Sequence, residues 1–311
     1  MLSRVADSLY WMSRYMERSD GILRMLRINY AYSQDDIPDF TWRAVLKIFS
    51  FCEEEDIVKM ERNGREVLRY MVLERENTNA VFNLVTQSRE NARAVQDHIT
   101  KELWQCLNEF YHSVRDQFLS NSLRIEDPIS VMDGLIKQCM LYYGTTEITM
   151  ARGEGFYYMN VGKYLERAIQ AVNILDVKFS EQNYDLNGTH DPIYWRYLLL
   201  SISGYELFLR SYRSTLEPRN IIDQIIWNEN FPRSILYSVV RLQRSFEKLE
   251  IDHQLESFKK LKFLIGKLKS RVQFSDIQTL EAEGLQNYLQ DIKNGLFEIG
   301  TAFNHYYFAY D

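Results

Sequence analysis

Two short stretches with one shared pattern decide how this chain folds, SRYMERS at residues 13–19 and GKYLERA at residues 162–168. Around each stretch, apolar residues recur three and four positions apart, which is the spacing of one face of an α-helix. The two stretches therefore predict two long amphipathic helices. The apolar rows are Leu9, Met12, Met16 and Leu23 in the first helix, and Val161, Leu165, Ala168 and Val172 in the second.

An arginine interrupts the apolar side of each helix, Arg18 in the first and Arg167 in the second. A buried guanidinium needs carboxylate or carbonyl acceptors for its donors, and Glu17 and Glu166 stand beside the two arginines. We expect the charges to pair, either as Glu17 with Arg167 and Glu166 with Arg18, or with the helix that holds residues 89–93. Two interpretations stay open: a structural ion-pair lock, or a ligand-binding or catalytic role.

Composition predicts an all-α protein. The chain has 311 residues, 46% of them hydrophobic, so it can bury a large core. It has only 13 glycines and 5 prolines, which leaves little material for hairpin turns. Period-two alternation of apolar residues is hard to find, whereas helical periods dominate.

Net charge and cysteine content indicate which partners and which cellular location to expect. A net charge of −6 provides no basic field for a phosphate backbone, so nucleic acid is not expected as a partner. Asp7 and Arg14 interrupt the first residues where a signal peptide needs an apolar run, and no membrane-spanning stretch is expected. Together with three widely spaced cysteines, expected to be reduced and buried, this favours a cytoplasmic protein without a membrane partner.

Helix boundaries are predicted from caps and breakers. The acidic run at residues 53–56 is typical of a solvated helix start. The expected helices cover about residues 2–32, a segment around 42–46, two short pieces divided at Asn63-Gly64, one long helix over about 77–118, one over about 129–150, and the second Glu-Arg helix from about 155.

The order of landmarks repeats half a chain length later. Glu17-Arg18 is followed by Glu166-Arg167, and Trp42-Arg43 by Trp195-Arg196, at a nearly constant offset. Pro232-Arg233 follows Ser88-Arg89, and Gly300-Thr301 follows Gly144-Thr145, in the same order. We expect one helical domain over 1–311, a bundle of two quasi-equivalent halves, about 1–150 and 151–311, related by internal duplication about a pseudo-two-fold axis.

Two further clusters are candidate binding groups. The six residues 88–93 include Arg89, Glu90, Asn91 and Arg93, and the two arginines lie one helical turn apart, where they could grip a carboxylate or phosphate. A surface salt-bridge ladder has the same pattern. Arg233 is expected in the first turn of a helix, where the dipole disfavours a cation, which suggests an anionic partner.

Two Glu-x-x-His pairs, Glu109 with His112 and Glu250 with His253, raise the question of a metal site. In a di-iron bundle, such pairs combine with two further glutamates, here Glu17 and Glu166. Glu250 to His253 has the pattern of a helix end, and Glu109 lies on the polar flank of its helix. The sequence predicts neither a metal nor a cofactor. Nucleophile motifs and phosphate-binding glycine loops are absent from the sequence.

These motifs resemble those of the bacterial alpha-E domain family over essentially the whole chain. The resemblance rests on MLSRVADSLYW at residues 1–11, the paired Tyr-x-Glu-Arg motifs, RENAR at 89–93 with Trp104 downstream, and FPRS at 231–234. Ser13 and Lys163 depart from the usual Gly-Arg-Tyr pattern. The resemblance implies an all-helical protein encoded beside a circularly permuted ATP-grasp ligase, and hence a role in ATP-dependent amide or peptide-bond formation.

Two functional hypotheses result. The first is a non-catalytic partner that binds the ligase or a peptide through the Glu-Arg groups and residues 89–93. The second is an enzyme of the same pathway, in which Glu17 or Glu166 acts as acid or base in a central cleft.

Overall fold

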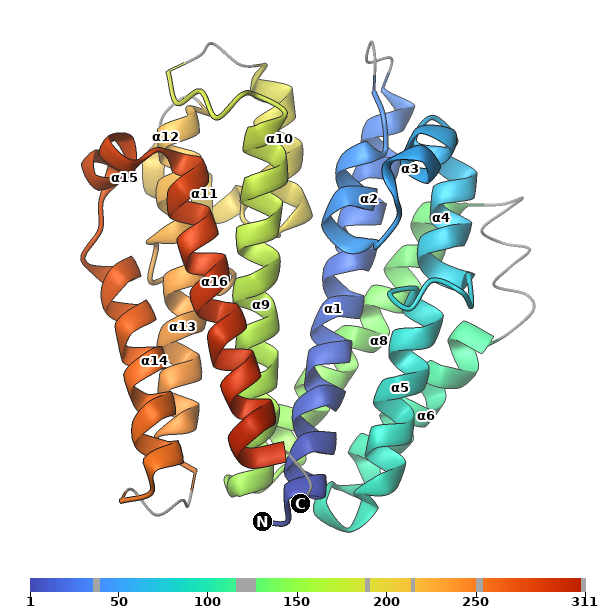
Figure 1. Ribbon diagram of the computed structural model, residues 1–311. Helices are drawn as coiled ribbons and strands as arrows, with labels where there is room; N and C mark the ends of the chain where they lie inside the picture. The colour runs from blue at the N-terminus through green and yellow to red at the C-terminus, as the bar shows by residue number, and fades with distance from the viewer. Residues whose placement is uncertain (36–39, 116–126, 188–190, 214–215, 250–253, 309–311) are drawn as a thin grey trace. The chain divides into compact units, whose positions relative to one another are not determined.

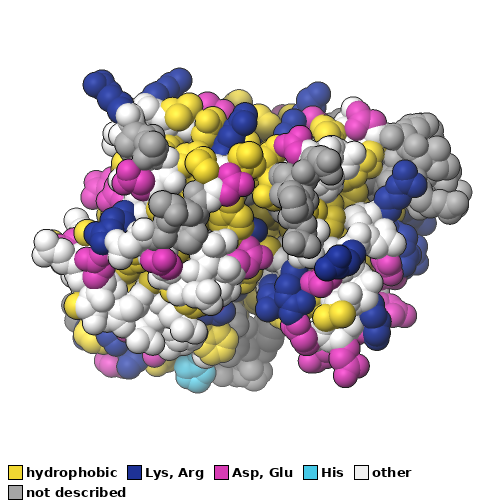
Figure 2. Space-filling view, turned by 90° about the horizontal axis from the view of Figure 1, so that it is seen from above, with side chains coloured by type: hydrophobic (Ala, Val, Ile, Leu, Met, Phe, Trp, Pro, Cys, Tyr) yellow, Lys and Arg dark blue, Asp and Glu magenta, His cyan; other side chains and the backbone are white. Residues whose placement is uncertain are grey.

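The computed structural model describes residues 1–35, 40–115, 127–187, 191–213, 216–249 and 254–308 (Figure 1). Within these ranges the chain forms fifteen α-helices and no strand, which confirms the all-α class. None of these helices is both long and apolar enough to cross a membrane. Positive and negative side chains are interspersed on the face drawn in Figure 2.

The chain divides into two compact units. The first, here called the N-terminal unit, is Trp11–Ala151; the second, the C-terminal unit, combines Met1–Tyr10 with Arg152–Asp311. Helix α1 contributes its first residues to the C-terminal unit and the remainder to the N-terminal unit.

The N-terminal unit is a bundle of long helices with three short helices between the first and second of them. The helices are α1 (Ser3–Gln34), α2 (Arg43–Phe49), α3 (Glu54–Met60), α4 (Gly64–Leu73), α5 (Val81–Ala94), α6 (Lys101–Arg115) and α8 (Pro128–Thr149). Helix α6 packs against both α5 and α8. Side-chain hydrogen bonds tie α1 to α8 and α5, through Ser13 to Tyr142 at 2.9 Å and through Ser88 to the Met12 carbonyl at 3.2 Å.

The C-terminal unit has the same kind of order, a long helix, three short helices and then further long ones. They are α9 (Glu154–Ser180), α10 (Pro192–Ser201), α11 (Tyr205–Tyr212), α12 (Pro218–Ile226), α13 (Ile235–Phe246), α14 (Glu256–Gln273), α15 (Ile277–Glu283), α16 (Leu285–Phe303) and the π-helical turn η2 (Asn304–Phe308). Helix α9 packs against α13 and α16, and α14 packs against the same two helices.

Aromatic rings fill the core of the C-terminal unit. Tyr10 of α1 lies with its ring centroid 5.9 Å from that of Phe303 and 4.9 Å from that of Phe308. Phe246 lies 5.8 Å from Phe303 and 5.0 Å from Phe258. Such rings bury large apolar areas, so the start of α1 is firmly part of this core.

Polar caps fix two of the expected helix starts. Asn63 and Asp127 accept hydrogen bonds from the backbone N–H groups of Glu66 and Ile129, so they begin α4 and α8. Gly64 has a packing role, because an added Cβ would lie 2.8 Å from the Nε1 of Trp42. Trp42 itself is buried at the start of α2.

One expected helix is wrong. The segment expected to form a single helix over about 77–118 forms α5, the short 3-10 helix η1 (Gln96–His98) and α6 as far as residue 115, and residues 116–118 lie outside the described residues. Thr100 starts α6 by accepting a hydrogen bond from the Leu103 N–H at 3.2 Å. The break lets α5 and α6 pack on one another and bury both apolar stripes.

Candidate functional site

Helix α1 buries two carboxylates inside the N-terminal unit. Glu17 and Asp20 each have 0% of their surface exposed, and they lie one turn apart on the helix. The Tyr143 hydroxyl of α8 donates a 2.7 Å hydrogen bond to the Oε2 of Glu17. Buried carboxylates need such partners, because an isolated charge in a low-dielectric interior is very costly.

Asp20 is paired within its own helix. The Arg24 Nε lies 2.9 Å from each of the two carboxylate oxygens of Asp20. The Arg24 side chain keeps 22% of its surface exposed, so the guanidinium lies at the edge of the buried region. Burial is the largest single influence on the pKa of Arg24, and it lowers that pKa. The charge and the hydrogen bond of Asp20 act in the opposite direction, and the pKa of Arg24 is raised overall.

A buried thiol lies beside these charges. Cys139 of α8 is fully buried, and its pKa is raised well above the ordinary value by burial first and by the negative charge of Asp20 second. Because the thiolate is the reactive form of cysteine, burial and the raised pKa make Cys139 a poor nucleophile. Cys106 is buried too, and Cys52 is half-buried against the Tyr70 hydroxyl at 3.0 Å.

Arg18 connects α1 to the start of α5. Its Nη1 donates a 3.0 Å hydrogen bond to the Oδ1 of Asn79, and the Nδ2 of Asn79 donates to the Phe49 carbonyl at 2.9 Å. Arg18 is half-buried. The arginine of the first motif therefore fixes the chain just before α5.

Arg167 makes a corresponding contact inside the C-terminal unit. Its Nη1 donates to the Pro232 carbonyl at 3.2 Å, just before α13, and its guanidinium lies over the Tyr164 ring at 5.4 Å. Glu166 is buried with 2% of its surface exposed. In both units the motif arginine thus bonds to the segment that leads into the next long helix.

The two motif helices differ in the turns after their Glu-Arg pairs. Where α1 continues with Asp20 and Arg24, the matching places of α9 hold Ile169 and Asn173. The buried Oδ1 of Asn173 has no hydrogen-bond partner among the described residues. Only the N-terminal unit therefore combines the motif glutamate with a second buried carboxylate at these positions.

The cluster at residues 89–93 is divided between packing and solvent. The Arg89 Nε donates to the Asn108 Oδ1 at 2.8 Å, and the guanidinium lies over the rings of Trp104 at 5.3 Å and Tyr111 at 4.6 Å. The Arg89 side chain is 19% exposed and the Arg93 side chain 66%. Arg89 is therefore half-buried because α6 packs beneath it, whereas Arg93 lies at the surface.

The two arginines share one acidic neighbour. Glu90 accepts from the Nη1 of Arg89 at 2.6 Å and from that of Arg93 at 3.5 Å, whereas Asn91 is half-buried on the same helix. This arrangement is that of a salt-bridge ladder, and it leaves Arg93 accessible to a partner.

The expected position of Arg233 is also wrong. Ser234 is the N-cap of α13 and accepts a 3.0 Å hydrogen bond from the Tyr237 N–H, so Arg233 precedes the helix instead of lying in its first turn. The argument from a misplaced cation therefore no longer holds. Ser88-Arg89, the pair that was matched with Pro232-Arg233, lies inside α5, whereas Pro232-Arg233 precedes α13. These two landmarks therefore do not occupy equivalent positions.

The two Glu-x-x-His pairs are the remaining candidates, and only one of them lies in the described part of the chain. Glu109 and His112 are exposed on α6, whereas Glu250 and His253 lie outside the described residues. Among the residues that the structure describes, no three His, Cys, Asp or Glu side chains are grouped to hold a metal ion.

The predicted pairing between the two motifs stays a prediction. Glu17 and Arg18 belong to the N-terminal unit, and Glu166 and Arg167 to the C-terminal unit. The contacts within each unit, to Tyr143, Asn79 and Pro232, are the partners that sequence reasoning missed.

Comparison with known proteins gives one family. The match is to Alpha-E, described as a predicted alpha-helical domain with a conserved ER motif, and it covers residues 1–308. No curated protein and no solved structure matches the chain. Because this match covers nearly the whole chain, the chain belongs to the Alpha-E family.

Proposed function

We propose that this chain is a non-catalytic component of an ATP-dependent amide or peptide ligation system, and that it binds an ATP-grasp ligase or its peptide. The link to ligation comes from the family resemblance. The observation that carries the non-catalytic part is the use of Arg18 and Arg167 in bonds to Asn79 and the Pro232 carbonyl. Arginines engaged in this way position helices rather than substrates.

Arg93 supports the partner-binding part. It projects from α5 with 66% of its side chain exposed, next to Glu90. Arginine is enriched at the centres of protein interfaces, and its planar donors suit a carboxylate on a partner. Because Arg89 is held by Asn108 and two rings, Arg93 is the arginine of this cluster that a partner can reach.

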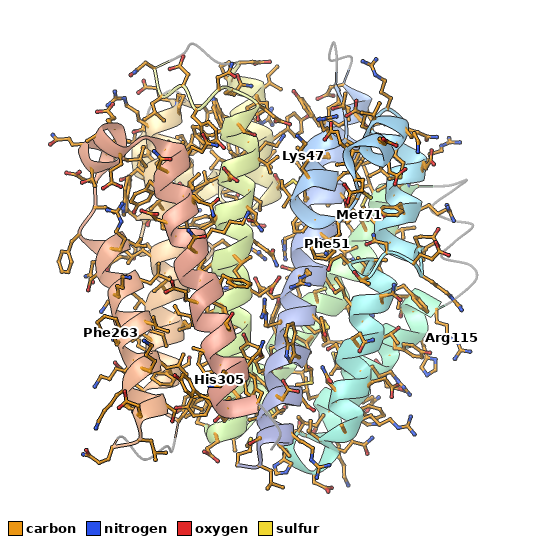
Figure 3. The ribbon with its side chains drawn as sticks, in the orientation of Figure 1. Lys47, Phe51, Met71, Arg115, Phe263 and His305 are labelled. Carbon is orange, nitrogen blue, oxygen red and sulfur yellow. The ribbon has the colours of Figure 1, made fainter. Side chains whose placement is uncertain are left out.

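The test is a calorimetric titration of the purified protein with the co-encoded ATP-grasp ligase. Arg93→Glu should weaken binding, whereas Lys47→Glu, a matched charge reversal on α2 of the same unit (Figure 3), should not. Both variants should keep the native melting temperature, because exposed charges contribute little to folding. Equal affinity of all three proteins, or no binding by the native chain, would contradict the proposal.

We also infer that one Alpha-E domain spans the chain and arose by duplication. In support, the long helices follow one another in a comparable order in the two units. They are α1, α5, α6 and α8 in the N-terminal unit, and α9, α13, α14 and α16 in the C-terminal unit. When the two units are aligned by these helices, Asn79 corresponds to Pro232 in place of Ser88. Each of the two residues accepts a hydrogen bond from the motif arginine of its own unit. Superposition of each unit, taken alone, should bring Glu17 onto Glu166; a different best match would contradict the duplication.

An enzymatic role is the second candidate. It is favoured by the fully buried Glu17, which has the Tyr143 hydroxyl at 2.7 Å, an arrangement in which an acid or base can be tuned. Glu17→Gln and Glu166→Gln would then abolish ligation in a reconstituted mixture while leaving ligase binding intact. Full turnover with both variants would exclude this role.

A further inference from the structure

A groove of about 490 Å³ lies between α14 and α16 of the C-terminal unit. Its size falls in the range of pockets that bind small ligands. Leu264, Lys267, Leu268 and Arg271 of α14 form one wall, and Asn294 and Glu298 of α16 lie on the other. The groove thus combines an apolar base with cations on one helix and polar and acidic groups on the other.

The floor of the groove depends on a glycine. A Cβ added to Gly295 would lie 3.1 Å from the Cδ1 of Leu268, closer than ordinary van der Waals contact. The missing side chain therefore lets α16 approach Leu268, so the two helices lie close together at the base of the groove. A ligand with an apolar side chain would bury it there.

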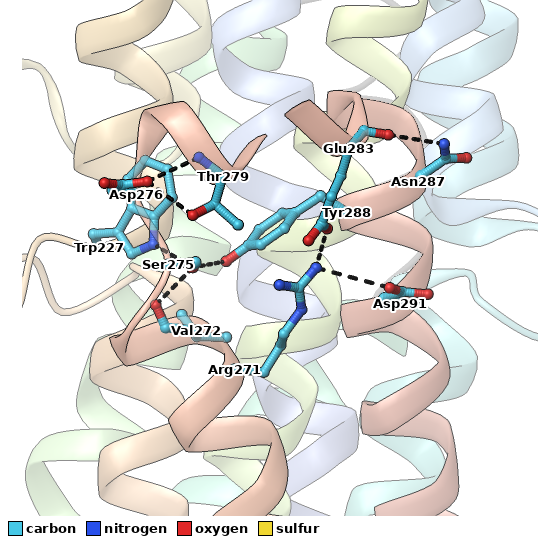
Figure 4. Close-up of polar contacts among 10 residues, drawn as sticks. All are labelled: Trp227, Arg271, Val272, Ser275, Asp276, Thr279, Glu283, Asn287, Tyr288 and Asp291. Atoms are coloured by element: carbon cyan, nitrogen blue, oxygen red, sulfur yellow. Dashed lines mark hydrogen bonds and ion pairs between the residues drawn. The ribbon is translucent and has the colours of Figure 1, made fainter. Parts of the chain in front are cut away.

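Arg271, one of the lining residues of the groove, is held by several polar contacts (Figure 4). Arg271 bonds to Glu283, lies 3.8 Å from Asp291 and covers the Tyr288 ring at 4.9 Å. The Tyr288 hydroxyl lies 2.5 Å from the Ser275 hydroxyl. These contacts hold Arg271 in place, and its charge is already balanced.

The middle of the groove presents polar groups that the protein leaves unused. The Oδ1 of Asn294 accepts from the Gln290 side chain at 2.9 Å, which leaves the Asn294 Nδ2 as a donor. Within the described residues Lys267 and Glu298 form no ion pair, with each other or with any other side chain, although both line this groove. The two opposite charges are available for a ligand that carries the complementary ones.

We propose that this groove binds an unblocked dipeptide with an apolar side chain. Its carboxylate meets Lys267 and the Asn294 amide, its ammonium meets Glu298, and its side chain lies over Leu264 and Leu268. Asn294 and Glu298 are one helical turn apart, about 6 Å along the axis. Two extended residues span at most about 7 Å, so both ends of a dipeptide can reach their partners at once.

The test is an NMR titration of the full chain alone with alanyl-leucine, followed through backbone amide shifts. Because no ligase is present, its result is independent of the proposed function. Glu298→Gln and Lys267→Gln should each weaken binding about fivefold, the expected effect of one partly exposed charge pair. Asn294→Asp, which replaces a donor with an acceptor, should weaken it further.

Blocked ligands separate the two ends. Glu298→Gln should leave the affinity for N-acetyl-alanyl-leucine unchanged, and Lys267→Gln should leave that for alanyl-leucine amide unchanged. Lys259→Gln is the matched control on α14, an exposed lysine that does not line the groove. Absence of saturable shifts at residues of this groove, or equal losses for blocked and unblocked ligands, would overturn the proposal.

Discussion

The Tyr143 hydroxyl donates a 2.7 Å hydrogen bond to Glu17, a carboxylate with no exposed surface. Tyr143→Phe removes this donor and keeps the ring. We expect the free energy of unfolding to fall by about 1–3 kcal/mol, the cost of leaving a buried charged acceptor with one partner fewer. Urea denaturation measures it, and Tyr306→Phe at a 40% exposed ring is the control. Equal midpoints for both variants would show that Glu17 does not depend on Tyr143.

Replacing only one partner of the ion pair between Asp20 and Arg24 should lower the stability of the protein considerably. Asp20→Asn leaves Arg24 without its carboxylate and should lower the free energy of unfolding by about 3 kcal/mol, the low end for a buried pair because Arg24 is partly exposed. The double change Asp20→Ile with Arg24→Asn copies α9 and should cost less than the single change. A larger loss in the double variant would argue against this account.

The motif arginines should contribute less to stability than fully buried charges do. Arg18 and Arg167 are half-buried and each makes a hydrogen bond, to Asn79 and Pro232. We expect Arg18→Ala and Arg167→Ala each to lower the free energy of unfolding by about 1–2 kcal/mol. A fully buried ion pair that loses one partner costs more, about 3–5 kcal/mol, and a structural lock between the motifs would give that value. Thermal melts decide between the two values, and an unchanged melting temperature would mean that these bonds do not stabilise the fold.

Arg89 and Arg93 should behave differently although they are one turn apart. Arg89→Ala removes the packing on Trp104 and Tyr111 and the bond to Asn108, so it should cost about 1–2 kcal/mol. Arg93→Ala should change the stability by less than about 0.5 kcal/mol. Chemical denaturation of the two variants side by side tests this. Equal losses would contradict the assigned packing of Arg89.

Stability should fall at alkaline pH. Burial raises the pKa of the Cys106 thiol from 9.0 to about 11, and the charge of Glu109 adds to the effect. The unfolded thiol therefore ionises first, so the contribution of Cys106 is complete below about pH 9 and is lost as the pH rises toward about 11. Urea midpoints at about pH 8 and about pH 10 should differ more for the native chain than for Cys106→Ala. Identical pH dependence of the two would contradict a shifted thiol.

The long helices could be predicted because their apolar periods are local. The break between α5 and α6 could not, since it contains neither glycine nor proline and depends on Thr100 as a cap. Arg233 was misplaced because Ser234 is the stronger cap. Such errors arise where two local preferences compete over a few residues.

The candidate site was predictable only in part. Glu17, Arg18, Glu166 and Arg167 stand out as charges within apolar rows. Their partners are distant in sequence, as Tyr143 is from Glu17, and no local pattern points to them. Asp20 and Arg24 have the spacing of a surface pair, and only the structure shows that Asp20 is buried near Cys139 of α8. Packing between helices therefore decides what the local pattern leaves open.

The division of α1 between two units has a consequence for synthesis on the ribosome. Residues 1–10 emerge long before their core partners, because Phe303, which packs on Tyr10, lies almost three hundred positions later. The N-terminal unit can close while the chain is still growing, but the C-terminal unit must wait for α16 with its earliest segment still unpaired. A fragment that starts at Arg152 would lack that segment, so the second unit cannot be produced intact by truncation, only by joining residues 1–10 to its end.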